Sequence, residues 1–244
     1  AATTMTSRRT TAWKSLREVL NRLALTDPLL TQLQTALSES EASTSPVRAL
    51  VGQKLMIANF FLLTAAQEEA LYRKIRNANP TISTLPPVDY RTRPEYRTDF
   101  DVLMNYSDEL IAAGGQDFPE LLDSAARIHG QLAALSAHGR MFSGGDRGNN
   151  GFIPAQAAWE SRRRIALVVI AVERFRIANQ NRLPADLQEL VPTFLGTVPT
   201  DPFDGSPLRY HRPTRGYVVY SIGGDRKDDL GVEGKSDRDP GDIA

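Results

Sequence analysis

The residues best suited to chemistry lie in the last 24 positions, SIGGDRKDDLGVEGKSDRDPGDIA. This segment holds six Asp and one Glu together with five Gly. Carboxylates on a flexible backbone supply the hard oxygen ligands that calcium prefers, about six to eight for each ion. An acidic, glycine-rich C-terminus is also commonly just a solvated tail. Taken alone, the segment leaves two interpretations open, a tail and a metal-binding loop.

No motif elsewhere in the chain identifies an enzyme. The HExxH zinc motif, the GxSxG nucleophile turn and the spacing of an EF-hand are all absent from the sequence. His129 and His138 fall in one predicted helix, where about 100° per residue sets them on roughly opposite sides, so they cannot share a metal ion. We therefore expect a non-enzymatic protein, with a hydrolase built from acidic residues as a minor alternative.

Composition removes further classes of function. The 244-residue chain has no Cys, which excludes disulfides, thiolate metal sites and a Cys nucleophile. Its 29 basic and 29 acidic residues are spread evenly over both halves, so there is no electrostatic footprint for nucleic acid. The RRRI run at Arg162 is interpreted as a solvated helix end. No apolar stretch reaches the ~18–20 residues that a membrane span needs.

The first part of the chain has helical periodicity and is predicted to be an all-α domain over residues 1–140. Predicted helices cover residues 11–25, a segment that begins at Asp27, and a long stretch from Ser45 to about Arg76. After a proline-rich loop, further helices are predicted before Gly114 and Gly139. The glycine-rich residues 141–153 are predicted to be a linker, since they lack the Lys-Ser/Thr of a phosphate loop.

The second part, residues 154–244, has a different pattern. One long helix is predicted from Pro154 to about Asn179, with an apolar run at 165–172 that should be covered on several sides. A short helix follows Pro184, and LRYHR and GYVVYSI are predicted to form a β-hairpin. The predicted fold class is therefore α+β, a helical domain followed by a long helix, a small antiparallel sheet and the acidic loop.

Six features in order along this second part resemble the globular domain of bacterial pseudopilins. The helix ends in RFRIANQNRLP, an L..L segment follows, and then come DPFDGSPLRY, a strand ending in YSIGGDR, the acidic loop and a terminal Asp-Ile. The closest resemblance is to the major pseudopilins of the type II secretion system, and it covers about a third of the chain.

The resemblance implies that the acidic loop binds a structural calcium ion. The Ile222 carbonyl and Asp225 match ligand positions of the family, while the later carboxylates are harder to place because this loop is longer. The predicted metal ligands are Ile222, Asp225, Asp228, Asp229 and Asp239, with Asp237 and Asp242 as further candidates.

The chain also departs from the pseudopilin pattern, because it begins with about 140 helical residues and not with a hydrophobic helix. We expect either an anchor upstream of Ala1 or a pseudopilin-like module reused in another envelope protein, and we favour a combination, a larger membrane-anchored protein with a pseudopilin-like C-terminal domain. The predicted function is that of a periplasmic or extracytoplasmic envelope protein, membrane-anchored in its full-length form and related to secretion or pilus-type assemblies. Its expected partners are other envelope or secretion proteins or further copies of itself. The alternative is a ligand- or peptide-binding module that uses the helical domain or an interdomain cleft.

Overall fold

The computed structural model describes residues 25–40, 46–78, 90–136, 151–234 and 241–244, with the single positions 15 and 18. The chain forms two compact units, one joining Ala1–Thr44 to Phe152–Ala244 and the other made by Ser45–Gly151. The described residues are mostly helical and include one two-stranded antiparallel sheet. The predicted α+β class is therefore confirmed.

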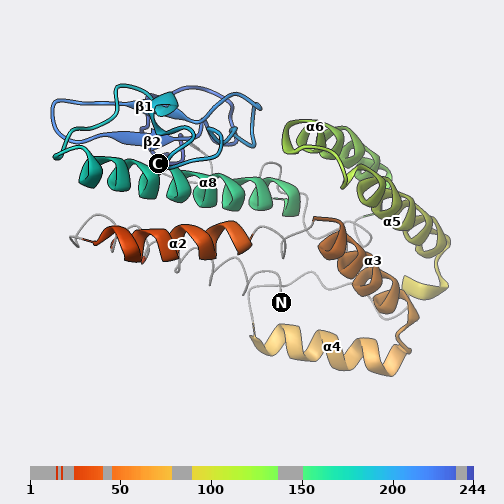
Figure 1. Ribbon diagram of the computed structural model, residues 1–244. Coiled ribbons are helices and arrows are strands. Elements are labelled where there is room, and N and C mark those ends of the chain that lie inside the picture. The colour runs from red at the N-terminus through yellow and green to blue at the C-terminus, as the bar shows by residue number, and fades with distance from the viewer. Residues whose placement is uncertain are drawn as a thin grey trace. The chain divides into compact units, whose positions relative to one another are not determined.

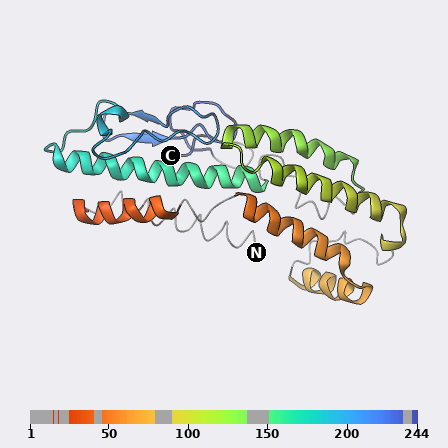
Figure 2. The ribbon, with the colours of Figure 1, turned by 45° about the vertical axis from the view of Figure 1, so that its right-hand side comes forward.

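Helix α8 (Phe152–Ala178) is the centre of the first unit. Figures 1 and 2 show α2 (Asp27–Glu39) lying along one side of α8 and the β-hairpin with its loops on the other. The apolar run of α8 is buried almost all round, as its lack of a polar face predicts. Phe175, Leu190 and Val219 join it in one core with the short 3₁₀ helix η5 (Leu187–Leu190).

The hairpin consists of β1 (Arg209–His211) and β2 (Val218–Tyr220), which pair antiparallel with Tyr210 opposite Val219. The predicted strands are longer than the observed ones, LRYHR by two residues and GYVVYSI by four, but their positions and pairing agree with the structure. Gly216 has a φ of +78°, a conformation that glycine adopts without strain, in the turn before β2.

Helix α2 packs on α8, and this differs from the predicted division at residue 140. The Arg174 guanidinium of α8 donates to Asp27 Oδ1 and to Gln34 Oε1, both at 2.8 Å. Gln34 Nε2 in turn donates to the Phe194 carbonyl at 2.7 Å. These contacts join segments about 140 to 160 residues apart, which local periodicity does not reveal.

The RRRI run is also different from its predicted solvated state. Arg163 is 5 % exposed and donates to both carboxylate oxygens of Glu160, at 2.7 and 2.8 Å. Arg163 Nη1 donates to the Leu37 carbonyl at 3.1 Å, and so it attaches α2 to α8. Arg164 donates to Glu160 and to the Thr200 carbonyl. Arg163 and Arg164 share the Glu160 carboxylate and also bond to backbone carbonyls, so both contribute to holding the first unit together.

The second unit is helical, and α3 (Pro46–Leu62) packs on α5 (Pro94–Ala113) in opposite directions. The Phe61 ring lies 5.2 Å from that of Phe100, while Lys54 pairs with Asp108 further along α5. The other elements are α4 (Ala65–Ala78), η2 (Tyr90–Thr92), α6 (Phe118–His129) and η3 (Gly130–Ala134).

The long helix predicted from Ser45 to Arg76 is divided into α3 and α4. Thr64 and Gln67 form a capping box: the Thr64 N–H donates to Gln67 Oε1 at 2.9 Å and the Gln67 N–H to Thr64 Oγ1 at 3.3 Å. This cap starts a new helix and accounts for the break. Among the described residues no single helix is long and apolar enough to span a membrane, and α3 with Ala65–Lys74 passes that test only as a pair bent by 119°.

Phe61→Ala should strongly destabilise the second unit, because Phe61 is 5 % exposed and contacts Tyr96 and Phe100. We expect a loss of about 3–5 kcal/mol from the free energy of unfolding. Leu62→Ala is the matched control, because Leu62 is next to Phe61 in the sequence but its side chain is 79 % exposed. This control should change the free energy of unfolding by less than about 0.5 kcal/mol. Urea unfolding followed by circular dichroism measures both, and equal losses would contradict this packing.

Candidate metal centre

The described parts of the acidic C-terminal segment form a hydrogen-bonded loop. Ser221, directly after β2, pairs antiparallel with Ile243 through two backbone hydrogen bonds of 3.0 and 2.9 Å. The Asp242 N–H donates to the Val232 carbonyl at 3.0 Å. The end of the chain therefore returns to the place where the loop begins, which favours the loop over the solvated tail for these residues.

Two glycines make this return possible. Gly223 has a φ of +68°, and a Cβ there would lie 2.6 Å from the Gly241 carbonyl oxygen. Gly231 has a φ of +83°, and a Cβ there would lie 2.8 Å from a methyl group of Val218. A side chain at either position would be strained and would meet neighbouring atoms. Glycine at these two positions therefore lets the chain fold back on itself.

The start of the loop is attached to Asp201, which has no exposed surface. Asp201 Oδ1 accepts from Ser221 Oγ at 2.8 Å and from the Phe203 N–H at 3.0 Å. Its Oδ2 accepts from the Ile222 N–H at 2.9 Å and from Arg209 Nη1 at 2.7 Å. The first Asp of DPFDG thus positions the residues that lead into the loop.

Asp242 lies at the centre of the loop and is only 3 % exposed. Its Oδ2 accepts from the Gly231 N–H at 2.6 Å and from the Asp229 N–H at 3.0 Å. Its Oδ1 is buried and has no hydrogen-bond partner in the described part of the chain. A buried carboxylate oxygen without a donor or a cation is costly, so this atom needs an explanation.

The electrostatics of the loop single out the same residue. Burial raises the pKa of Asp242 above its ordinary value, the hydrogen bonds from Gly231 and Asp229 oppose this, and the charges of Asp228 and Asp229 raise the pKa further. Burial also raises the pKa of Tyr220 to about 12, helped by its hydrogen bond to Asp228 and by the charges of Asp228 and Asp242. The charges of Asp228 and Asp229 therefore act on the buried Asp242 carboxyl.

The predicted metal ligands differ in burial and in their hydrogen bonds. Ile222 is buried and its N–H is bonded to Asp201, while Asp225 is half-buried and accepts from the Lys227 N–H at 3.2 Å. Asp228 is exposed and accepts from the Tyr220 hydroxyl and the Leu230 N–H, both at 3.0 Å. Asp229 is exposed. Asp237 and Asp239 lie outside the described residues.

These residues do not by themselves make a cage of side chains. Within the described ranges, no three His, Asp or Glu side chains lie close enough together to hold a metal ion. The donor types fit calcium, since carboxylates and loop carbonyls are hard oxygen ligands, and the unpartnered Asp242 Oδ1 is the atom that fits best. The predicted ligand set stays a prediction, with Asp242 moved from a further candidate to the first.

Sequence reasoning missed two positioning residues, Asp201 and Arg209. Arg209 pairs with both Asp201 and Asp204, so it ties β1 to the DPFDG turn. The DPFDGSPLRY string contained the signal, since it sets two Asp residues shortly before an Arg at the start of a predicted strand.

Comparison of this chain with protein-family models, with curated proteins and with solved structures gave no match. The assignment of function therefore depends on the residues of the loop and on the resemblance described above.

Asp201→Ala should lower the free energy of unfolding by about 3–5 kcal/mol, because three buried donors lose their acceptor and Arg209 keeps only Asp204. Asp204→Ala is the matched control, since it removes the other carboxylate on Arg209 and its side chain is 25 % exposed. That control should cost about 1 kcal/mol or less. Denaturant unfolding measures both, and similar losses would contradict the positioning role of Asp201.

In the presence of a chelator, the contribution of Asp242 to the stability of the first unit should fall as the pH rises from below 3.8 through its raised pKa. In that interval the folded carboxyl keeps a proton that the unfolded chain has already lost, so ionisation favours unfolding. Asp242→Asn should remove this pH dependence and be at least as stable as the wild type at pH 7. The same pH dependence of stability in the wild type and the variant would contradict it.

Proposed function

We propose that this chain is a non-enzymatic cell-envelope protein whose C-terminal unit is pseudopilin-like and is stabilised by structural calcium. The observation that carries the proposal is the buried Asp242 Oδ1, which has no hydrogen-bond partner in the described part of the chain. The charges of Asp228 and Asp229 raise the pKa of the Asp242 carboxyl, so they disfavour its ionised form. A divalent cation would stabilise the ionised form of all three carboxylates.

In this proposal some residues position the loop and others bind the ion. Asp201 holds the Ser221–Ile222 segment, and the Ser221–Ile243 pairing brings the chain end back beside it. The Asp229 and Gly231 N–H groups fix Asp242 through Oδ2 and leave Oδ1 for a metal. Asp228 and Asp229 supply further negative charge, and Asp225, Asp239 and the Ile222 carbonyl remain the other proposed ligands. When bound, calcium supplies positive charge, and carbonyl and water oxygens complete its coordination.

The envelope role is supported by the order of the pseudopilin-like features and by the elements that carry them. The long helix, the hairpin and the returning acidic loop occur in the order that the resemblance implies. We propose accordingly that the first unit binds other envelope or secretion proteins or further copies of itself. A periplasmic or extracytoplasmic location is part of the same proposal.

Calcium should stabilise the full chain against thermal unfolding, compared with the same protein in a chelator. At a concentration about a hundred times the dissociation constant, the gain should be about 2.7 kcal/mol. Asp242→Asn should abolish the gain, because it removes the charge at the buried oxygen. Asp228→Asn and Asp229→Asn should each reduce it. Differential scanning calorimetry with calcium and with chelator measures these shifts.

Asp101→Asn is the control, since Asp101 is an exposed carboxylate in the second unit and should leave the calcium response unchanged. No shift on adding calcium to the wild type would sink the metal proposal. A shift that survives in Asp242→Asn would place the ion elsewhere.

A further inference from the structure

The two faces of the β-hairpin contact different parts of the first unit. Successive side chains of a strand point to opposite faces, and Val219, the middle residue of β2, belongs to the core that includes α8. Val218 and Tyr220 lie on the other face, against the acidic loop. A Cβ at Gly231 would lie 2.8 Å from a methyl group of Val218 and 3.4 Å from Tyr220 Cδ1. Tyr220 is buried in this position, so it is a direct contact between the hairpin and the loop.

The Tyr220 hydroxyl is bonded to one of the candidate metal ligands. It donates to Asp228 Oδ1 at 3.0 Å, and the Leu230 N–H donates to the same oxygen at 3.0 Å. Burial and the hydrogen bond to Asp228 raise the pKa of Tyr220 to about 12, so the hydroxyl keeps its proton at neutral pH. Asp228 is thus held through one oxygen, as Asp242 is held through Oδ2 by two N–H groups. The other oxygen of each carboxylate has no hydrogen-bond donor within the described ranges.

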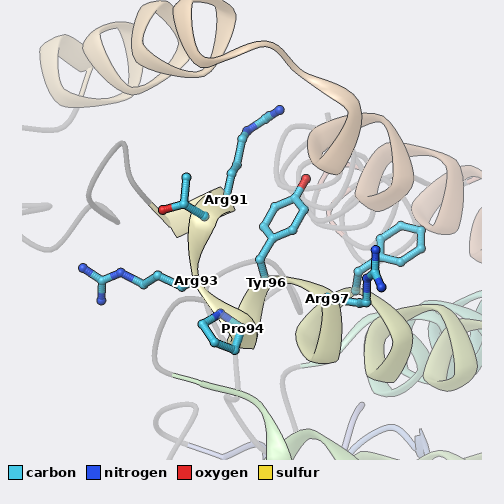
Figure 3. Close-up of a pocket in the computed structure, with 7 residues that line it drawn as sticks. Arg91, Arg93, Pro94, Tyr96 and Arg97 are labelled. Atoms are coloured by element: carbon cyan, nitrogen blue, oxygen red, sulfur yellow. The ribbon is translucent and has the colours of Figure 1, made fainter.

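A tyrosine–carboxylate pair in the second unit shows how such a charge can be balanced. The Tyr72 hydroxyl donates to Oε1 of the buried Glu68 at 2.8 Å, and Arg91 Nε donates to Glu68 Oε2 at 2.9 Å. Figure 3 shows the Arg91 side chain extending from η2. One oxygen of Glu68 therefore accepts from the tyrosine and the other from a cation, which makes the burial of this carboxylate tolerable.

The same arrangement occurs in the first unit, directly before β2. The Tyr217 hydroxyl donates to Glu173 Oε1 at 2.8 Å, and Arg176 donates twice to Glu173 Oε2, at 2.6 and 2.9 Å. Asp228 has the tyrosine but forms no ion pair in the part of the chain that the structure describes. Its charge acts on Arg209, but that guanidinium is bonded to two other aspartates. The second oxygen of Asp228 therefore fits the metal ion proposed for this loop.

We propose that Tyr220 is a positioning residue of the acidic loop, whose hydroxyl holds Asp228 Oδ1 and leaves Oδ2 for the ion bound by Asp242. The proposal rests on the calcium site proposed above and adds the residue that orients one of its ligands. A hydrogen-bond partner fixes the orientation of a metal ligand, and its loss typically weakens metal binding about 10- to 100-fold. The Tyr220 ring also lies against Gly231, whose N–H holds Asp242, so one side chain supports both carboxylates.

The test is isothermal titration calorimetry of the full chain with calcium chloride. Tyr220→Phe keeps the ring and removes the hydroxyl, and it should weaken calcium binding about tenfold or more. Tyr217→Phe is the matched control, since it removes a hydroxyl that donates to Glu173 and not to the loop, and it should leave the calcium affinity unchanged. In chelator both variants should lower the unfolding temperature by about 2–4 °C, because each loses one hydrogen bond. A difference in affinity between them therefore reports positioning and not stability.

A double-mutant cycle tests whether Tyr220 acts through Asp228. In the Asp228→Asn background, Tyr220→Phe should have little further effect on calcium affinity, because residues that act through one another are not additive. If the wild type binds calcium, equal affinities of Tyr220→Phe and Tyr217→Phe overturn the positioning role alone, and so does a full additional loss in the Asp228→Asn background. Absence of calcium binding by the wild type overturns the calcium site and this proposal together.

Discussion

Asp201 is fully buried, and several separate segments of the first unit are held together by donating hydrogen bonds to its carboxylate. Its two oxygens accept four hydrogen bonds, from Ser221, Ile222, Phe203 and Arg209. A buried carboxylate persists only when it is paired in this way, so the turn before β1, β1 itself and the segment after β2 are held together as one structure. The acidic loop begins from that fixed point, and its geometry depends on it.

Asp242 is the second buried carboxylate of the loop, at its other end, and only one of its two oxygens accepts hydrogen bonds. Two N–H groups satisfy Oδ2, while Oδ1 has no partner among the described residues. Asp228 and Asp229 add like charges where donors would be expected. The difference between the two buried carboxylates is the physical basis for assigning a cation to one and a structural role to the other.

The sequence predicted the elements of the C-terminal unit more closely than their assembly. The long helix was predicted from Pro154 to Asn179 and spans Phe152–Ala178, since an apolar run with a clear end is a local signal. The packing of α2 on α8 could not be predicted in this way, because it depends on pairs such as Arg174 and Asp27 that are distant along the chain. The break between α3 and α4 was in the sequence, as the Thr64–Gln67 capping box, and was missed beside the strong apolar pattern around it.

For the candidate site too, the local sequence predicted the loop but not which of its carboxylates is buried. Counting acidic residues found the loop, and the resemblance favoured its first carboxylates, but burial ranks Asp242 above them because the chain end folds back beside β2. A crystal structure grown with calcium tests this most directly. The account predicts an ion within ~2.3–2.6 Å of Asp242 Oδ1, with further oxygen ligands from the loop. A protein donor or a water molecule bonded to that oxygen, with no ion in the loop, would contradict it.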